Sequence, residues 1–396
     1  MLECDVAIVG GGPVGGYIAG RIAKEKFSVA LFERNKEIGA SLNCAGLISP
    51  RVFDFLDISK EDVIQNEIRG AHIHSPSGHV LTIGGDRVHA LAIDRSKFDE
   101  EIIKKSESKG AKIFLQNNVL SAQKISEHIE LKTSQNLDVK CKLLIGADGP
   151  HSKIRDRFAF PEPQEFLRGI GAEVKNTNLD SDFLEIFVGK NVAPGFFAWI
   201  IPTNKKETNA RIGLCIGQES AQSPKYYFSN FFKNKFSSPF LENAEITKHI
   251  GGVIPLGILK RTYDSNVMLV GDAAAQVKPT SGGGIYSGIL CANHCSNVSI
   301  DALKKNNFTS QFLKKYHKLW FSDIGRELNL GMKFRRIFKG LSDEQFDKYI
   351  EKFNDTKITG IISKYGDIDY PSKLVKPLIK NTPSLLKLIP YIIKEK

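Results

Sequence analysis

The chain has 396 residues, 41% of them hydrophobic and 25% charged, and its formal net charge is +11 at pH 7. This length favours two or three domains over one small core, and the composition is that of an ordinary soluble globular protein. No apolar run reaches the ~18 residues that a transmembrane helix needs, no secretory signal precedes the first apolar run, and the six cysteines lack a zinc-binding spacing, so we expect a cytoplasmic protein with reduced thiols.

The first elements in chain order are a strand, a glycine turn, a helix and a second strand. The apolar run Val6–Val9 leads into Gly10-x-Gly12-x-x-Gly15, and the second apolar run ends on Glu33. The first glycine permits the tight turn, the second lets the backbone approach a pyrophosphate, and the third lets helix and strand pack closely. A carboxylate on the second strand can accept hydrogen bonds from ribose hydroxyls. The unit therefore predicts a dinucleotide site, and a glycine-rich turn without a ligand is the alternative.

The next segment mixes strands with one helix. Residues 70–93 alternate between polar and apolar around two turns, which predicts a β-meander. A helix is expected from residue 93 to about Gly110, which would cap its C-terminus. Strands are then expected at residues 112–115, 128–132 and 140–145.

Two later stretches again place a strand end before a tight turn and a helix. The first is Gly146-Ala-Asp148-Gly149-Pro-His-Ser-Lys-Ile-Arg155, and the second is Gly271-Asp272, followed by a loop of small residues and a helix over 285–303. Between them, regular turns and short apolar runs predict an antiparallel sheet over 166–218, and residues 222–247 are predicted to be helical.

The last quarter of the chain is predicted to be helical and basic. Residues 301–396 carry 20 lysines and arginines against 11 acidic residues, which accounts for +9 of the net charge. Such a segment favours an anionic partner, and because no nucleic-acid-binding module accompanies it, we expect no nucleic acid. The stretch from Leu374 to Lys394, apolar with regular lysines and broken by three prolines, could lie on an anionic membrane. Packing against the protein body, or a solvated lysine-rich surface, is the alternative.

Three of these motifs, in this order, resemble one superfamily. The glycine turn with Glu33, the Gly146–Arg155 stretch and Gly271-Asp272-Ala-Ala are similar to the motifs of FAD-dependent oxidoreductases of the para-hydroxybenzoate hydroxylase superfamily, over roughly residues 1–300. The middle motif distinguishes this superfamily from NAD dehydrogenases, which share the glycine turn but lack the middle motif.

Two further stretches resemble the archaeal geranylgeranyl reductase family, which uses FAD to reduce prenyl double bonds of membrane lipid precursors. They are residues 272–286 and Pro194-Gly-Phe-Phe-Ala-Trp-Ile-Ile-Pro202, and the tail sequences Gly325-Arg-Glu-Leu and Gly366-Asp-Ile-Asp-Tyr-Pro agree with them. One departure is at Cys44-Ala-Gly, where several members have Cys-Gly-acid: the cysteine is present and the acid is absent.

The resemblance implies an α/β fold with three parts. These are a glutathione-reductase-like FAD-binding domain made of residues 1–70, 94–160 and 260–303, an inserted antiparallel β-sheet substrate domain made of 71–93 and 161–259, and a helical, basic C-terminal region, 304–396.

The resemblance also assigns cofactor-binding roles. An arginine placed as Arg95 contacts FAD in this superfamily, and an aspartate placed as Asp272 binds the ribityl chain; a surface ion pair and a structural helix cap are the respective alternatives. Asp148 is expected to brace its turn or to contact the cofactor. Backbone N–H groups at Gly282–Gly284 could face the flavin and stabilise the negative charge of its reduced form. The expected FAD-binding set is Gly10, Gly12, Pro13, Val14, Gly15, Glu33, Arg34, Cys44, Ala45, Arg95, Asp148, Asp272, Gly282, Gly283, Gly284 and Ile285.

Reducing an isolated alkene requires a hydride and a proton delivered nearly together, so the site should be dry and apolar and hold one acid. Cys44 is the candidate beside the flavin; it could instead be a small buried apolar residue, with a water or the reduced flavin supplying the proton. The residues expected to line the prenyl channel, or alternatively to be ordinary core, are Phe196, Phe197, Trp199 and Tyr286.

Two clusters with metal-binding residue types are interpreted as structural. His72 and His74 share a strand face, as ordinary sheet histidines do. Cys291, His294 and Cys295 have helical spacing but lack a fourth ligand. We therefore expect no metal site.

The sequence thus predicts FAD-dependent saturation of prenyl chains in archaeal-type ether lipids. The expected partners are an isoprenoid lipid substrate and an electron donor, NAD(P)H or a ferredoxin, with peripheral contact at the inner face of the cell membrane. Two alternatives share the same motifs or fold. One is a flavin monooxygenase, and the other is a prenyl carrier without catalytic activity.

Overall fold

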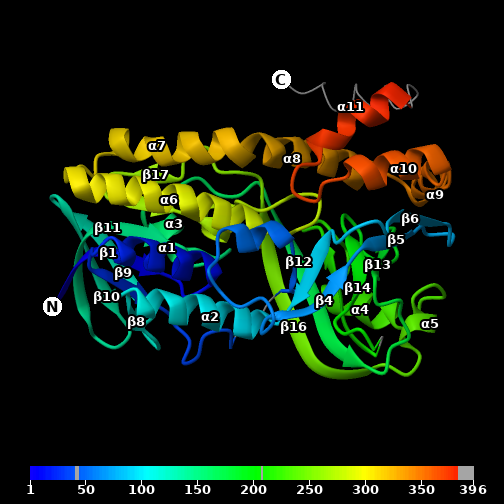
Figure 1. Ribbon diagram of the computed structural model, residues 1–396, viewed down its shortest axis with the longest axis horizontal. Helices are drawn as coiled ribbons and strands as arrows, with labels where there is room; N and C mark the ends of the chain where they lie inside the picture. The colour runs from blue at the N-terminus through cyan, green and yellow to red at the C-terminus, as the bar shows by residue number, and fades with distance from the viewer. Residues whose placement is uncertain (41–43, 207, 382–396) are drawn as a thin grey trace.

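The computed structural model describes residues 1–40, 44–206 and 208–381, and it contains two large sheets side by side (Figure 1). The first has eight strands, with β17-β18-β11-β1-β2-β8 in order and β10 and β9 continuing from β11. Its central pairs are parallel, and Val6–Val9 of β1 is buried on both faces, as the apolar run predicts. The strands are β1 (Leu2–Val9), β2 (Val29–Phe32), β8 (Lys112–Phe114), β9 (Val119–Ile125), β10 (His128–Thr133), β11 (Asp138–Gly146), β17 (Tyr263–Asp264) and β18 (Val267–Leu269).

Helices cover one face of this sheet. On the other face lies a smaller hydrophobic core, to which the β9–β10 hairpin contributes side chains. The covering helices are α1 (Pro13–Lys24), α2 (Arg95–Ser108) and α6 (Ile285–Lys305). Pro13 occupies the first turn of α1, where its missing N–H costs no hydrogen bond. The carboxyl ends of β1 and β18 and the N-termini of α1 and α6 therefore meet at one edge, where ligands of open α/β sheets bind.

The second sheet has seven strands in the order β16-β12-β15-β14-β13-β5-β6. All pairs are antiparallel except β13 with β5. One face packs on α4 (Pro224–Phe231) and α5 (Ser238–Leu241). The strands are β5 (Gly70–His74), β6 (Val80–Gly84), β12 (Glu165–Lys175), β13 (Phe183–Val188), β14 (Phe197–Pro202), β15 (Asn209–Ile216) and β16 (Glu245–Leu256).

A small third sheet, β3-β7-β4, lies between the large ones and corrects one prediction. It consists of β3 (Leu47–Ile48), β4 (Ile64–Ile68) and β7 (Ala90–Ile93). The meander predicted over 70–93 is wrong in part, because β7 pairs with β3 and β4 rather than with β6. The helical prediction for 222–247 is also wrong in part, because β16 begins at Glu245 and pairs with β12.

The C-terminal helices run along both large sheets, with α7 and α8 in one line and α9 and α10 beside β6 (Figure 1). The elements are α7 (Ser310–Trp320), the π-helical turn η3 (Phe321–Gly325), α8 (Arg326–Gly340), α9 (Asp343–Phe353), α10 (Thr356–Tyr365) and α11 (Ser372–Asn381). Pro377 lies inside α11, so it does not break the chain there as expected. The rest of the predicted lysine-rich stretch, 382–396, is outside the described residues.

The predicted fold class, an α/β FAD-type domain with an antiparallel substrate sheet and C-terminal helices, is confirmed. The domain boundaries given above stay predictions. None of the helices described is both long enough and apolar enough to cross a bilayer.

Candidate functional site

One continuous cavity of about 930 Å³ joins the two large sheets. It extends from the glycine turn after β1, past the loop before α6, to the substrate sheet and the segment before α11. Every residue of the predicted site lines it except Gly15, which is buried in the turn. The volume is near the upper end of the range for small-molecule sites, so the cavity has room for a ligand as long as a dinucleotide.

The glycine turn combines two glycines fixed by packing with one that faces open space. A Cβ on Gly10, whose φ is +109°, would collide with the Ala147 carbonyl oxygen, and one on Gly15 would collide with the Gly10 carbonyl oxygen. No protein atom lies within 4 Å of a Cβ placed on Gly12. Gly12 also precedes α1 without a side-chain cap, so free N–H groups at this helix end face the cavity. This is a cradle suited to a phosphate group.

Glu33 is held against the turn by two backbone hydrogen bonds. Gly11 N–H donates to its Oε2 at 2.8 Å, and Asn35 N–H donates to its Oε1 at 2.8 Å. Glu33 and the neighbouring Arg34 both line the cavity. Each carboxylate oxygen keeps a further acceptor position, which suits the ribose contact that the sequence predicts.

Asp148 braces the start of the short helix α3 (Lys153–Arg157). Its carboxylate accepts hydrogen bonds from Ser152 Oγ at 2.6 Å and from the N–H of Lys153 at 2.7 Å. Burial raises the pKa of Asp148, although these hydrogen bonds lower it in part. The residue also lines the cavity, and its contact with a cofactor stays a prediction.

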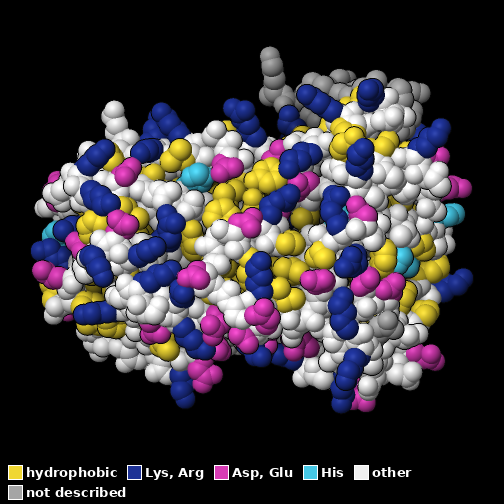
Figure 2. Space-filling model, viewed as in Figure 1, with side chains coloured by type: hydrophobic (Ala, Val, Ile, Leu, Met, Phe, Trp, Pro, Cys, Tyr) yellow, Lys and Arg dark blue, Asp and Glu magenta, His cyan; other side chains and the backbone are white. Residues whose placement is uncertain are grey.

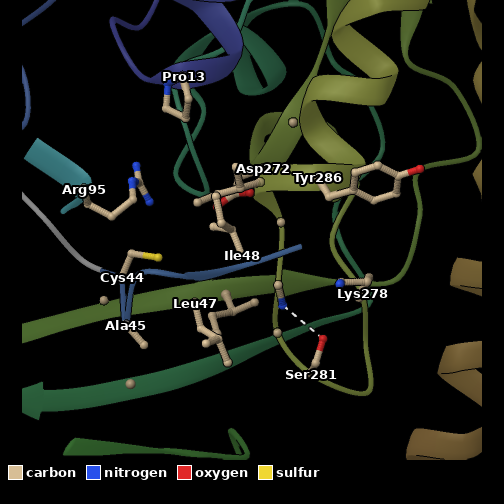
Figure 3. Close-up of a pocket in the computed structure, with 18 of the residues that line it drawn as sticks. Pro13, Cys44, Ala45, Leu47, Ile48, Arg95, Asp272, Lys278, Ser281 and Tyr286 are labelled. Carbon is tan, nitrogen blue, oxygen red and sulfur yellow. Dashed lines mark hydrogen bonds between the residues drawn. The ribbon is translucent and has the colours of Figure 1, made fainter. Parts of the chain in front are cut away.

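Asp272 faces the cavity beside the N-terminus of α6 (Figure 3). Among the residues described, none forms a hydrogen bond to its carboxylate that would offset burial. Burial raises the pKa of Asp272 to about 6, and the Arg95 guanidinium lowers it in part. The Asp272 carboxylate can therefore accept hydrogen bonds from a ligand with hydroxyl groups in a site that is shielded from water.

The three glycines before α6 let the chain bend closely around this carboxylate. Gly282 has a φ of +71°, and a Cβ on Gly284 would lie 2.8 Å from Asp272 Oδ1. Gly284 begins α6 without a side-chain cap, and Ile285 follows it in the cavity wall. The uncapped end of a 21-residue helix favours a group that carries or gains negative charge.

Arg95 and Cys44 lie together on the opposite side of the cavity (Figure 3). Arg95 pairs with Asp99 at 2.9 Å, and 12% and 7% of the two side chains are exposed, so the ion pair of the alternative is present but does not lie on the surface; contact of Arg95 with FAD stays a prediction. Burial alone lowers the pKa of Arg95, but the Asp99 carboxylate and the Cys44 sulfur outweigh it and raise the pKa above its usual value. The Cys44 sulfur also accepts the Gly46 N–H at 3.3 Å, and Ala45, between them, lines the cavity.

The substrate sheet presents its apolar face to the cavity through the alternation of β14. Phe197 and Trp199 face the cavity, whereas Ala198 and Ile200 face the core under α4. Phe196, just before the strand, stacks on Phe197 with ring centroids 4.2 Å apart.

Tyr286 lies on the first turn of α6, and its hydroxyl is 3.0 Å from the hydroxyl of Tyr370. Burial raises its pKa, so Tyr286 stays neutral. It lines the cavity together with the predicted aromatic residues of β14.

Sequence reasoning missed the charged residues that hold the cavity wall. Lys278 Nζ is 2.7 Å from Asp369 Oδ1, and both groups are buried. Asp369 also accepts hydrogen bonds from Ser49 Oγ at 2.6 Å and Arg51 Nη1 at 2.7 Å. Arg211, described below, was missed as well. The only signal was indirect, because Lys278 and Asp369 lie inside stretches that resemble the reductase family, without an assigned role.

The histidine and cysteine clusters are occupied by ordinary contacts. His74 Nε2 is 2.5 Å from Glu185 Oε2, and its ring stacks on Phe187. His294 pairs with Asp323, and Cys291 and Cys295 are buried in α6. In the described part of the chain, no group of three or more potential ligands is placed to hold a metal ion.

The fold and this cavity are those of a protein that can bind a dinucleotide between a Rossmann-like sheet and a second, largely antiparallel sheet. Comparisons with known proteins agree. The family described as "FAD binding domain" matches residues 3–298, and the chain belongs to this family. FAD is accordingly its cofactor, and it fits the open cradle at Gly12 and the Asp272 carboxylate, which no other described residue hydrogen-bonds.

Full-length relatives narrow the family further. The chain is 31% identical to an uncharacterized protein of Methanocaldococcus jannaschii, over 96% of this chain and 95% of that protein. It is 30% identical to the digeranylgeranylglycerophospholipid reductase of the same organism, over 97% and 96% of the two chains. The resemblance to archaeal geranylgeranyl reductases is thereby confirmed.

Solved structures share the fold. A geranylgeranyl bacteriochlorophyll reductase-like protein from Thermoplasma acidophilum superimposes with a TM-score of 0.87 at 22% identity, covering 99% of this chain and all of the other. The p-nitrophenol 4-monooxygenase of Pseudomonas putida gives 0.72 at 17% identity, covering 94% of this chain and 99% of the other. A reductase-like protein and a monooxygenase thus share this architecture.

Replacing Asp272 by asparagine should stabilise the FAD-free protein at pH 7 while weakening FAD binding. Because the pKa of Asp272 is raised to about 6 from 3.8, its contribution to stability is fully present below pH ~4 and is lost as the pH rises through 6. D272N removes this penalty, so the free energy of unfolding should rise by about 3 kcal/mol at pH 7 and by less than ~1 kcal/mol at pH 4. Urea unfolding of the FAD-free protein at both pH values measures this.

The matched control is D301N, which alters an exposed carboxylate paired with Lys315 at 2.8 Å. The pKa of Asp301 is lowered by this partner, so D301N should not stabilise the protein at pH 7. Equal stability of D272N and the wild type at pH 7 would contradict the account of Asp272.

Proposed function

We propose that this protein is a FAD-dependent reductase that saturates prenyl C=C bonds in archaeal-type ether-lipid precursors. The observation that carries the proposal is the continuity of the cavity, which joins the phosphate cradle at Gly12, the loop at Gly282–Gly284 and the aromatic face of β14. An apolar channel of this kind suits a long hydrocarbon substrate. The names of full-length relatives support the same substrate class.

Bound FAD, once reduced by the electron donor, would supply the hydride for this reaction. The chain's own contribution is to exclude water and to hold a proton source near the alkene. Phe197 and Trp199 form an apolar wall of the cavity. An alkene carbon that gains positive charge as its neighbour is protonated would therefore meet little water there. Cys44 Sγ is the candidate proton donor, or holds the water that serves as donor, since it lines the cavity beside Arg95. The glycine loop before α6 would stabilise negative charge at its helix end.

The lipid substrate would reach the cavity from the end that carries α11. Leu374 lines the cavity, whereas Lys373, Lys376 and Lys380 of the same helix are exposed. Lysine and arginine side chains surround hydrophobic ones at this end of the molecule (Figure 2). This arrangement supports peripheral contact with an anionic membrane. The electron donor is proposed to be NAD(P)H or a ferredoxin.

The proposal is tested by anaerobic incubation of the FAD-loaded protein with dithionite and a digeranylgeranylglyceryl lipid. Mass spectrometry should show products heavier in steps of about 2 Da, one step for each double bond reduced. The control is the same protein stripped of FAD, which should leave the lipid unchanged. Unchanged lipid with the loaded protein would overturn the proposal.

If the lipid is not reduced, two parallel measurements distinguish the two alternative functions. Oxygen consumption driven by NAD(P)H, with hydroxylation of an aromatic compound, would favour a monooxygenase, a class that shares this fold. Tight retention of the lipid by a protein without a flavin absorbance spectrum would favour a prenyl carrier.

A further inference from the structure

Arg211 belongs to the substrate sheet, but its guanidinium contacts segments outside this sheet, on the opposite side of the cavity. It lies on β15, and only 5% of the residue is exposed. Its Nη1 donates to the carbonyl oxygens of Ile93 at 2.8 Å and Ala45 at 3.2 Å. Its Nη2 donates to Gln65 Oε1 at 2.7 Å, and its Nε donates to Glu173 Oε1 at 3.3 Å. Four acceptors from four separate segments thus converge on one buried cation.

The two carbonyls that Arg211 binds belong to the segments that present Cys44 and Arg95. Ala45 directly follows Cys44, and Ile93 is the last residue of β7, two positions before Arg95. Gly46 shows how close the approach is. Its φ is +67°, and a Cβ there would collide with Arg211 Nη1. Gly46 also accepts the Ile93 N–H through its own carbonyl at 2.8 Å, so both segments and the guanidinium form one packed unit.

A brace needed only for stability would not require a buried cation, because apolar packing joins sheets at lower desolvation cost. The guanidinium provides several donors in a fixed planar arrangement, which can hold two backbone segments in one relative position. Arg211 itself lines the cavity, so this fixed geometry extends to the cavity wall.

We propose that Arg211 is a positioning residue: it holds the Cys44–Gly46 loop and the start of α2 at a set distance from the substrate sheet, so that Cys44 and Arg95 face the cavity. The catalytic part of this inference rests on the proposed reductase function, and the geometric part does not.

The geometric part is tested by the rate at which iodoacetamide alkylates Cys44 in the purified, FAD-containing protein. A C4S background removes the other partly exposed cysteine, since the remaining four are buried. R211M should raise the alkylation rate of Cys44 about tenfold, because the loop loses its charge-assisted hydrogen bonds and opens more often. R211K, which keeps the charge and can bind one carbonyl, should fall between R211M and the background protein.

The matched control is R168M. Arg168 lies on the neighbouring strand β12 and donates to the carbonyls of Gln218 and Ser220, away from the cavity. R168M should leave Cys44 alkylation within about twofold of the background rate, because it does not touch the loop. An unchanged rate in R211M, or an equal rise in R168M, would overturn the proposal. Should R211M fail to fold, R211K gives the same test, with a rate equal to the background as the overturning result.

The catalytic part is tested with the lipid reductase assay. R211M should lower kcat about tenfold and change KM less than twofold, because misplacement of groups at the reacting centre affects the chemical step. A change in KM alone would overturn the positioning role. If the wild-type protein reduces no lipid, the proposed function fails, while the alkylation experiment still decides the geometry.

Discussion

A G12V variant should fold normally and purify without FAD. Gly12 has φ −78° and ψ −179°, which any residue adopts, and no protein atom lies within 4 Å of a Cβ at this position. The two valine methyl groups would instead occupy the space in front of the α1 N-terminus, where the pyrophosphate is expected. We expect FAD affinity to fall about 1,000-fold, which corresponds to ~4 kcal/mol. Flavin absorbance of the purified protein and FAD titration of the FAD-free protein measure this.

A matched control comes from a second glycine with equally open space. Gly360 lies inside α10, is exposed and does not line the cavity, and again nothing lies within 4 Å of its Cβ position. G360A should keep FAD and gain up to ~1 kcal/mol in unfolding free energy, because alanine is the better helix former. A G12V protein that retains one FAD per chain would show that the open space at Gly12 is not the phosphate cradle.

Gly12 also shows which features of the site could be predicted from sequence. The glycine turn, Glu33 and Asp272 each lie at the end of a short apolar run, so local pattern alone places them at one sheet edge. The alternation of β14 similarly predicts that Phe197 and Trp199 share a face. For these residues, the position in the chain relative to a strand is enough to predict the position in the structure.

Features that depend on distant pairing could not be predicted in this way. Arg211 contacts Ala45 across 166 positions, and Lys278 contacts Asp369 across 91. No local period indicates such contacts. The same reason explains the error at β7, which is correctly predicted to be a strand but whose partners β3 and β4 could not be identified from the pattern.

The second large effect is expected when Asp369 loses its charge. Asp369 is 1% exposed and joins Lys278 of the loop before α6 to Arg51 of η1 (Pro50–Asp54). D369N keeps the shape but leaves the buried Lys278 ammonium without a counter-charge. Breaking a buried pair on one side costs about 3–5 kcal/mol, so the unfolding free energy should fall by that amount. Urea unfolding of the FAD-containing protein measures the loss.

The segment around Asp369 should open locally in D369N under conditions in which the rest of the protein stays folded, because this segment closes the cavity. Asp367 and Ile368 line the cavity wall, so their backbone amides should exchange hydrogen faster in D369N than in the wild type. E25Q, which breaks the exposed pair of Glu25 and Lys304, should hardly change the unfolding free energy and should leave this exchange unchanged. The double variant K278M/D369L should lose less than D369N, because both charges of the pair leave together. A D369N protein as stable as E25Q would mean that this ion pair does not hold the segment on the cavity.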